Sequence, residues 1–482
     1  MAAKIVLVGA GSAQFGIGTL GDIFTSPTLQ GAEICLHDIN PATMEAVRQQ
    51  AQNYLDRYNS ADRQNQRIMA SPAGTEVVSN RTIPEKLDFT LTATTDRAQA
   101  LNKADFIIIS IEVGDRFKLW EEDWRIPQQY GINQVYGENG GPGGVFHSLR
   151  IIPPILDICT QAMELCPDAH IFCYSNPMTA ITTTVHRALP GIKFTGLCHE
   201  IASLERYLPT ILNRSFEELD LTAAGLNHFS CLLEARDRKT GTDLYPEIME
   251  KAYSFFATEP GYSDMYLHYK KTGKTAWTEG STSRAQLGIE DSAFPWADRG
   301  LFKFIMENYG LLPITVDSHF GEYLSWAWEL VDHRGIIDFF DFYKIALSQD
   351  HKPEITLELH ERVVPIMEGI LNDTGYLESA VNIPNNGFLP DLPDWIAVEV
   401  PANISKTGIH GKTIGSLPRG YAALLRNYTG VYDLTAEAII HKRKDYVIQA
   451  LLANPVVHRA VPLKDLVDRM IDHQDRWLGY LK

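Results

Sequence analysis

The chain has 482 residues, of which 45% are hydrophobic and 21% are charged, a balance that indicates a folded globular protein and excludes disorder as its main state. Acidic residues outnumber basic ones by 60 to 43, and the net charge of −17 argues against a nucleic-acid partner, because a phosphate backbone would be repelled. No apolar run approaches the roughly 20 residues of a membrane span, and the first residues lack the pattern of a signal peptide, so we expect a cytoplasmic protein without membrane contact.

Apolar runs and helical patterns alternate up to about residue 200. Each run is short and continuous and ends in a polar or glycine-rich turn, which is typical of a strand buried on both faces. The alternation predicts a doubly wound parallel α/β sheet of the Rossmann type. Strands are expected at 4–8, 33–38, 87–91, 104–110, 169–174 and 192–197, with helices that include 41–58 and 96–102.

The pattern changes in the second half of the chain, where pairs of strands precede long helices. We therefore predict two domains, 1–202 for the nucleotide and 203–482 as an α+β domain that packs on the first. The strands are expected at 219–226, 231–235, 380–383 and 395–400, and the helices at 298–309, 320–349, 355–373, 419–428, 433–454 and 462–478.

The first strand is followed by a sequence that indicates a nucleotide site. Gly9-Ala-Gly11-Ser12 would let the chain turn sharply into a helix whose N-terminal amides face a pyrophosphate. Asp38, at the end of the second strand, would accept hydrogen bonds from ribose hydroxyls and repel a 2′-phosphate, which favours NAD over NADP. Gln14 replaces the third glycine of the usual pattern, so an ordinary glycine turn is the alternative.

Polar residues follow three later strands, at the edge where an open α/β sheet binds its ligand. They are Asn176 in Ser-Asn-Pro-Met, Cys198 in Cys-His-Glu-Ile and His228 in Leu-Asn-His. Cys198 and His228 would both bind a divalent transition metal. Their separation of 30 positions matches no recognised metal spacing, so a core cysteine and a turn histidine are the alternative.

A run of glycines at 137–144 predicts a loop whose backbone lies close to a ligand. Glu138 in this loop is a candidate general acid, or else a solvated carboxylate. Asp317 is a candidate base, or else the N-cap of a helix at 319–332.

Two arginines accompany these acids. Arg116 follows the fourth strand, and Arg150 lies in the helix after the glycine loop. Either one would make a bidentate clamp for a carboxylate or phosphate, or else a surface ion pair with one of the many acids.

Taken together, these motifs resemble glycoside hydrolase family 4 over nearly the whole chain, in the order found in that family. The combination is far more specific than any single motif. The motifs are G-A-G-S-A-x-F at 9–15, G-P-G-G…L-R at 141–150, S-N-P-M at 175–178, C-H-E-I at 198–201, L-N-H at 226–228, G-L-L-P…D-x-H-x-x-E at 310–322 and V-N-I-P-N at 381–385.

The resemblance implies a Rossmann domain joined to an α+β domain akin to lactate and malate dehydrogenases, with NAD as a recycled cofactor and manganese(II) as the metal. It implies that Cys198 and His228 hold the metal, that Glu138 is the acid and that Asp317, which matches a family acid near the sugar, is the base. The implied cofactor-binding residues are Gly9, Gly11, Ser12 and Asp38, and the implied substrate-binding residues are Asn176, Arg116, Arg150, His199 and Glu200.

The resemblance also implies a mechanism and a substrate. NAD takes hydride from carbon 3 of the sugar, the ketone acidifies the proton on carbon 2, and elimination followed by addition of water breaks the glycosidic bond before the hydride returns. Because Cys-His-Glu resembles the α-galacturonidase branch, we expect α-galacturonidase activity on a small uronide, carried by a homodimer or homotetramer. The alternatives are an α-glucosidase, α-galactosidase or α-glucuronidase of the same family, or an NAD-dependent hydroxy-acid or sugar dehydrogenase.

Overall fold

A computed structural model describes most of the chain, and two of the predicted site residues, Ser12 and His199, lie outside the part described. The described residues are 2–11, 13–60, 84–198, 200–273, 296, 298–348, 354–357, 359 and 361–482.

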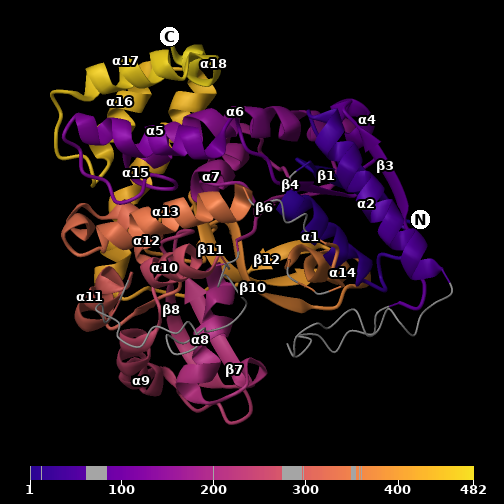
Figure 1. Ribbon diagram of the computed structural model, residues 1–482, viewed down its shortest axis with the longest axis horizontal. Helices are drawn as coiled ribbons and strands as arrows, with labels where there is room; N and C mark the ends of the chain where they lie inside the picture. Colours follow the sequence, from indigo (N-terminus) through magenta and orange to yellow (C-terminus); the bar gives the residue numbers. More distant parts are fainter. Residues whose placement is uncertain are drawn as a thin grey trace.

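Nine strands form one central sheet in the order β12-β11-β10-β6-β5-β4-β1-β2-β3 (Figure 1). The strands β1 to β6 run parallel, and their order is that of dinucleotide-binding folds, with the switch point between β1 and β4. The predicted parallel Rossmann-type sheet is therefore confirmed. These six strands are β1 Lys4–Val8, β2 Glu33–His37, β3 Thr90–Thr94, β4 Phe106–Ile109, β5 His170–Cys173 and β6 Phe194–Gly196.

The second half of the chain extends this sheet beyond β6. Strand β10 (Tyr376–Pro384) pairs antiparallel with β6, and β11 (Ala397–Ser405) and β12 (Gly408–Gly411) follow it to the edge. The predicted boundary at residue 202 thus falls between strands of one shared sheet.

A smaller antiparallel sheet contains β7 (Leu219–Ala224), β8 (Cys231–Asp237) and β9 (Leu312–Pro313). Gly225, directly after β7, exchanges two backbone hydrogen bonds with Glu399 of β11, at 3.1 and 2.9 Å. The two sheets are therefore joined just before His228.

Helices pack on the central sheet and on one another. Helix α7 contacts β6 and β10, α14 contacts β10 and β11, and α15 lies against α6 and α7 near the C-terminal helices (Figure 1). The helices of the first half are α1 Ala13–Phe24, α2 Pro41–Asn59, α4 Arg97–Leu101, α5 Arg116–Gln129, α6 Gly141–Leu165, α7 Met178–Ala188 and α8 Ser203–Leu212. Those of the second half are α9 Tyr245–Thr258, α10 Tyr262–Thr272, α11 Gly300–Tyr309, α12 Asp317–Phe320, α13 His333–Ser348, α14 Val363–Asn372, α15 Arg419–His441, α16 Lys444–Ala453, α17 Leu463–His473 and α18 Asp475–Leu478, with 3-10 turns η1 Glu200–Ala202, η2 Phe216–Glu218, η3 Gly321–Tyr323, η4 Ser325–Glu329 and η5 Gly479–Leu481.

Several predicted helices differ from the structure, and the one predicted at 355–373 begins only at Val363. The segment 320–349 is not one helix, because short turns over 321–329 precede α13. The break predicted between 428 and 433 is absent, since Gly430 continues α15 and packs toward Ala453 of α16. The chain turns instead at Lys442, whose φ of +55° ends the helix.

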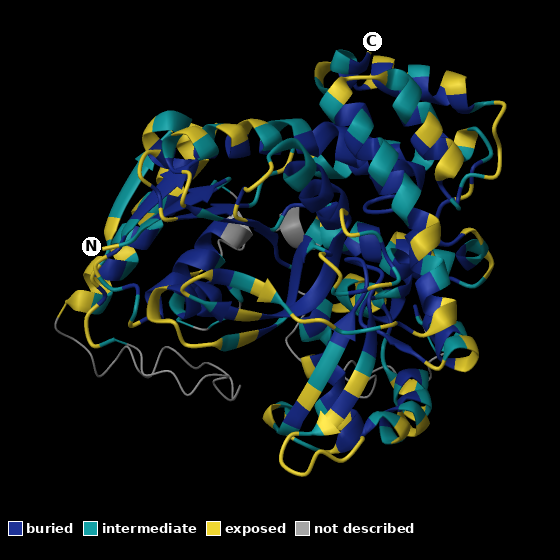
Figure 2. Ribbon diagram, turned by 180° about the vertical axis from the view of Figure 1, so that it is seen from behind, coloured by how far each residue is buried: buried dark blue, intermediate teal, exposed yellow. Residues whose placement is uncertain are grey.

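The buried residues concentrate on the central strands and on the helix faces toward them (Figure 2). β1 and β4 are buried along almost their whole length, as expected of inner parallel strands. Among the helices that the structure describes, none has the length and apolar character needed to cross a membrane.

Candidate active site

The loop after β1 packs closely against the neighbouring strand ends. Gly9 has a φ of +88°, and a Cβ there would lie 2.0 Å from the carbonyl oxygen of Ser110, which follows β4. Gly11 donates its amide to Asp38 Oδ2 at 2.8 Å, and a Cβ on Gly11 would meet the same oxygen. The two glycines are thus required by contacts within the protein, and not only by the approach of a pyrophosphate that the sequence suggested.

A third glycine compensates for Gln14. Gly16, inside α1, lies so close to the preceding turn that a Cβ would be 2.4 Å from the carbonyl oxygen of Ala10. This is the close packing that the third glycine of the usual dinucleotide pattern provides. Sequence reasoning missed Gly16 because it is displaced by two positions. The tight loop after β1 lies beside Asp38 at the switch point of the sheet, and this arrangement is suited to bind a dinucleotide.

Cys198 and His228 meet at the carboxyl edge of the sheet. Cys198 follows β6, His228 follows the turn after β7, and Sγ lies 3.4 Å from Nε2. Two ligands bound to one ion at roughly 2.3 and 2.1 Å are separated by about this distance. Burial lowers the pKa of His228 to about 4, so the ring is neutral, the form that binds metals.

The surroundings of this pair also suit a cation. Burial, with the nearby charges of Glu200 and Glu399, raises the pKa of the Cys198 thiol, an unfavourable setting for a thiolate unless a positive ion is bound. Within the described residues, Glu200 Oε2 and His228 Nδ1 are buried without a hydrogen-bond partner. The residues present therefore fit a divalent transition metal.

His319 links the metal residues to the glycine loop. Its ring stacks on that of His228 with centroids 4.5 Å apart, its Nδ1 is 3.1 Å from Glu200 Oε1, and its Nε2 is 3.4 Å from Glu138 Oε2. Ligand atoms of Glu200, His228 and His319 all lie within 4.8 Å of one another. The motif at 310–322 contained His319, but sequence reasoning gave it no role.

Glu138 is a buried carboxylate between two cations. Arg116 Nη2 lies 3.0 Å from Oε1, and His319 approaches Oε2. Burial by itself raises the pKa of Glu138, but the hydrogen bond from His319 and the charge of Arg116 outweigh it and hold the pKa well below its usual range. Burial likewise opposes protonation of His319, yet its bonds to Glu138 and Glu200 raise its pKa to about 10. In this arrangement the proton of the pair resides on His319, and the role of Glu138 as the general acid stays a prediction.

The predicted arginine clamp is not free. Arg150, 4% exposed, donates to Asp123 Oδ2 at 2.7 Å and to Gln474 Oε1 at 2.8 Å, so it ties α6 to α5 and to the start of α18. Arg116 is paired with Glu138 and lies 3.6 Å from Glu112. The ion-pair alternative therefore holds for both. The partners Asp123 and Glu138 are buried, whereas Glu112 is exposed.

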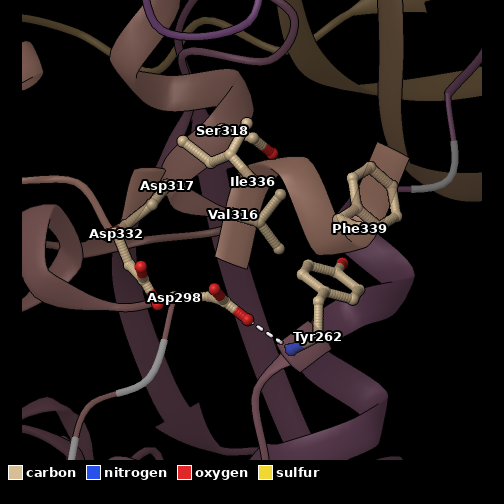
Figure 3. Close-up of a pocket in the computed structure, with 8 residues that line it drawn as sticks. All are labelled: Tyr262, Asp298, Val316, Asp317, Ser318, Asp332, Ile336 and Phe339. Atoms are coloured by element: carbon tan, nitrogen blue, oxygen red, sulfur yellow. Dashed lines mark hydrogen bonds between the residues drawn. The ribbon is translucent and has the colours of Figure 1, made fainter. Parts of the chain in front are cut away.

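Asp317 is separated from this cluster. Its two oxygens accept the amides of Leu301 and Phe302 at 2.8 and 2.9 Å, at the N-terminus of α11. It lines a small pocket with Tyr262 and Asp298 (Figure 3). Because both oxygens hold a helix end, the capping alternative fits this position, and the role of base stays a prediction. The capped helix is α11 and not the one predicted at 319–332.

Asn176 lies directly after β5, beside the β4 end. Its neighbour Ser175 joins the two strand ends by accepting the amide of Ile111 at 3.0 Å and donating to its carbonyl at 2.8 Å. In the described part of the chain, the buried Asn176 Oδ1 has no hydrogen-bond partner. Asn176 therefore keeps an unused hydrogen-bond acceptor near the sheet edge.

Comparisons with known proteins identify the family of the chain. The family model described as family 4 glycosyl hydrolase matches residues 4–77 and 62–214, and the model of its C-terminal domain matches 223–457. The chain is 56% identical to an alpha-glucosidase of Erwinia rhapontici over 482 residues, which is 100% of both chains. It is 28% identical to an alpha-galacturonidase of Thermoanaerobacterium saccharolyticum, over 79% of this chain and 81% of that one.

A solved structure shares the fold. It is a 6-phospho-alpha-glucosidase from gut microorganisms in complex with NAD and Mn2+, 20% identical, with a TM-score of 0.72 over 98% of each chain. Together with the matched family models and the relative of full length, these findings show that the chain belongs to family 4 of the glycosyl hydrolases and is a glycoside hydrolase.

Proposed function

We propose that the protein is an α-glucosidase that requires NAD and a divalent ion such as manganese(II). The observation that carries this proposal is the 56% identity, over all 482 residues, to the α-glucosidase of Erwinia rhapontici. The α-galacturonidase relative is only 28% identical, so the uronide expected from the Cys-His-Glu motif has the weaker support.

The charges at the site also favour a neutral sugar. A uronate carboxylate needs a cation that is not already neutralised. Arg116 is paired with Glu138, and Arg150 with Asp123. Glu200, whose pKa is held below its usual value against burial by His228 and His319, adds a negative charge beside the metal pair. The Glu200 carboxylate would repel an anionic substrate, whereas it would not repel a neutral glucoside.

The cofactors would be held at neighbouring positions along the sheet edge. Cys198 and His228 would hold the ion, and Gly9, Gly11 and Asp38 would hold the nucleotide, with the Asp38 carboxylate toward the ribose. When bound, the nicotinamide accepts a hydride reversibly and the ion polarises sugar oxygens.

The remaining roles fall to side chains of the chain itself. Asn176 Oδ1 would accept a hydrogen bond from a sugar hydroxyl. The hydrogen-bonded pair of Glu138 and His319 would supply the proton to the departing glycosidic oxygen. Because the pair is buried, this proton is kept from exchange with bulk water until the site opens.

The test is a set of p-nitrophenyl α-glycosides, offered with and without NAD and MnCl2. We expect release of nitrophenol from the α-glucoside only when both additions are present. Cys198→Ser should abolish this release. The matched control is Cys166→Ser, which changes a buried cysteine at the end of α6. Faster cleavage of the α-galacturonide, or full activity without NAD and metal, would overturn the proposal.

We further propose that the protein works as a homodimer or homotetramer, which mass photometry at nanomolar concentration would test directly. A single species at the mass of one chain would contradict this.

A further inference from the structure

The glycine loop encloses a carboxylate of the protein itself. Glu322, in η3 and 1% exposed, accepts the amide of Glu138 on Oε1 at 2.9 Å, and those of Asn139 and Gly140 on Oε2 at 2.6 and 2.5 Å. These three amides precede α6 (Gly141–Leu165), so the carboxylate sits at the positive end of that helix. The ligand that the glycine pattern suggested is therefore Glu322.

The close approach explains a glycine that backbone conformation does not require. Gly140 has a φ of −125°, which any residue can adopt. A Cβ at this position would nevertheless lie 2.7 Å from Glu322 Cβ and 2.9 Å from its carbonyl oxygen. Glycine is needed at position 140 because η3 packs directly against the loop there and leaves no space for a side chain.

The segment that carries Glu322 also carries His319. His319 holds the carboxylate of Glu138, and Glu322 holds its amide, so one short segment fixes both ends of this residue. On the far side of the loop, Gln134 Oε1 accepts the amide of Gly143 at 2.9 Å and braces the loop against α5. Glu138 has little freedom left to move relative to Arg116.

We propose that Glu322 is the positioning residue of Glu138, which it holds at the distance from His319 and Arg116 that the reaction requires. Glu322 touches neither the metal residues nor the predicted nucleotide loop among its hydrogen bonds, so it acts through the backbone of 138–140. The inference rests on the proposed glycosidase function.

The main variant is Glu322→Gln. Glutamine keeps the volume but places an NH2 group where one carboxylate oxygen accepted an amide, so two donors face each other and the loop shifts. A displacement of about 1 Å at a reacting group lowers the rate about 100-fold. We expect kcat to fall by about that factor on the nitrophenyl α-glucoside, with KM and the affinities for NAD and Mn2+ changed less than about threefold, because their residues stay in place.

Two further measurements separate positioning from general damage. Hydrogen–deuterium exchange of the peptide that covers 135–145 should speed up in Glu322→Gln, because the NH2 group replaces the acceptor of the Glu138 amide or that of the Asn139 and Gly140 amides. The rate loss should also be larger for alkyl than for nitrophenyl α-glucosides, since poor leaving groups depend more on the proton from the Glu138 pair. The control is Glu378→Gln, a buried carboxylate in β10 that also accepts two backbone amides.

Gly140→Ala perturbs the same contact from the loop and replaces Glu322→Gln if that variant does not fold. The proposal is overturned if the 135–145 peptide exchanges as in wild type, or if all substrates lose rate equally while NAD and Mn2+ binding weaken. The exchange result does not depend on turnover. If the wild-type enzyme cleaves no α-glycoside, the proposed function is wrong. The positioning of Glu138 by Glu322 is then still tested by hydrogen–deuterium exchange.

Discussion

Asp298 contributes to the pH dependence of the stability of this protein, and a single substitution should remove its contribution. Its Oδ2 accepts the amide of Tyr262, and its Oδ1 is buried without a partner among the described residues (Figure 3). Burial, reinforced by the charge of Asp332, raises its pKa from 3.8 to about 7. Between these two pKa values, the Asp298 carboxyl keeps its proton in the folded protein and loses it in the unfolded chain.

The sign and size of the effect follow from this pKa. For an acid with a raised pKa, stability is greatest below the unfolded value and is lost as the pH rises through the folded value. Between about pH 5 and pH 8 the unfolded chain is already ionised while Asp298 must still lose its proton in the folded state, which costs about 3 kcal/mol at about 1.4 kcal/mol per pKa unit.

Asp298→Asn should remove this loss. The residue has a φ of +57°, a conformation that asparagine tolerates, and the amide oxygen still accepts the Tyr262 amide. Urea unfolding followed by tryptophan fluorescence at about pH 5 and pH 8 should give a smaller fall in unfolding free energy for the variant, by about 3 kcal/mol. The matched control is Asp373→Asn, at an exposed aspartate with a φ of +55° whose pKa is lowered and which titrates below this window. Equal losses in wild type and Asp298→Asn would refute the reasoning.

Four further changes probe other parts of the chain. Cys198→Ser should weaken Mn2+ binding at least about tenfold by titration calorimetry while NAD binding is kept; unchanged Mn2+ affinity would remove Cys198 from the metal site. Asp38→Ala should weaken NAD binding by about 2 kcal/mol, measured by nicotinamide fluorescence, and equal binding of NAD and NADP by wild type would contradict its role. Asp317→Asn should lower unfolding free energy by about 1 kcal/mol, as expected for a lost helix cap, with kcat within about threefold; a loss of several hundredfold in kcat at full stability would instead restore it as the base. Arg150→Met should cost about 3 to 5 kcal/mol of stability by leaving Asp123 buried and unpaired, and an unaltered midpoint in urea would show that the pair is not needed.

The parallel sheet could be predicted because each of its strands is short, apolar and followed by a polar turn. The same regularity brought Asn176 and Cys198 to one edge, since strand ends in such a sheet meet there. His228 reaches this edge from β7 of the smaller sheet, through the pairing of Gly225 with Glu399 of β11. These predictions depend only on local pattern and on the general geometry of open α/β sheets.

Contacts between segments that are distant in the sequence could not be predicted from local patterns. That Glu322 fills the glycine loop is a contact across more than 180 positions, and no local pattern distinguishes it from a helix carboxylate. The sequence left two roles open for Asp317, because an acid ahead of an apolar helix has the same appearance whether it caps that helix or another. Arg150 resembled a ligand clamp only because its partner Asp123 lies in a different helix.

The pairing of β6 with β10 has a consequence for how the chain is made. β6 leads directly into Cys198, and the strand that covers its outer edge is not synthesised until about 180 residues later. During translation the nascent N-terminal half therefore leaves the ribosome with an open sheet edge just ahead of the metal residue, a template for mispairing with other chains. Gene fragments cut near residue 202 should therefore be recovered mainly in inclusion bodies.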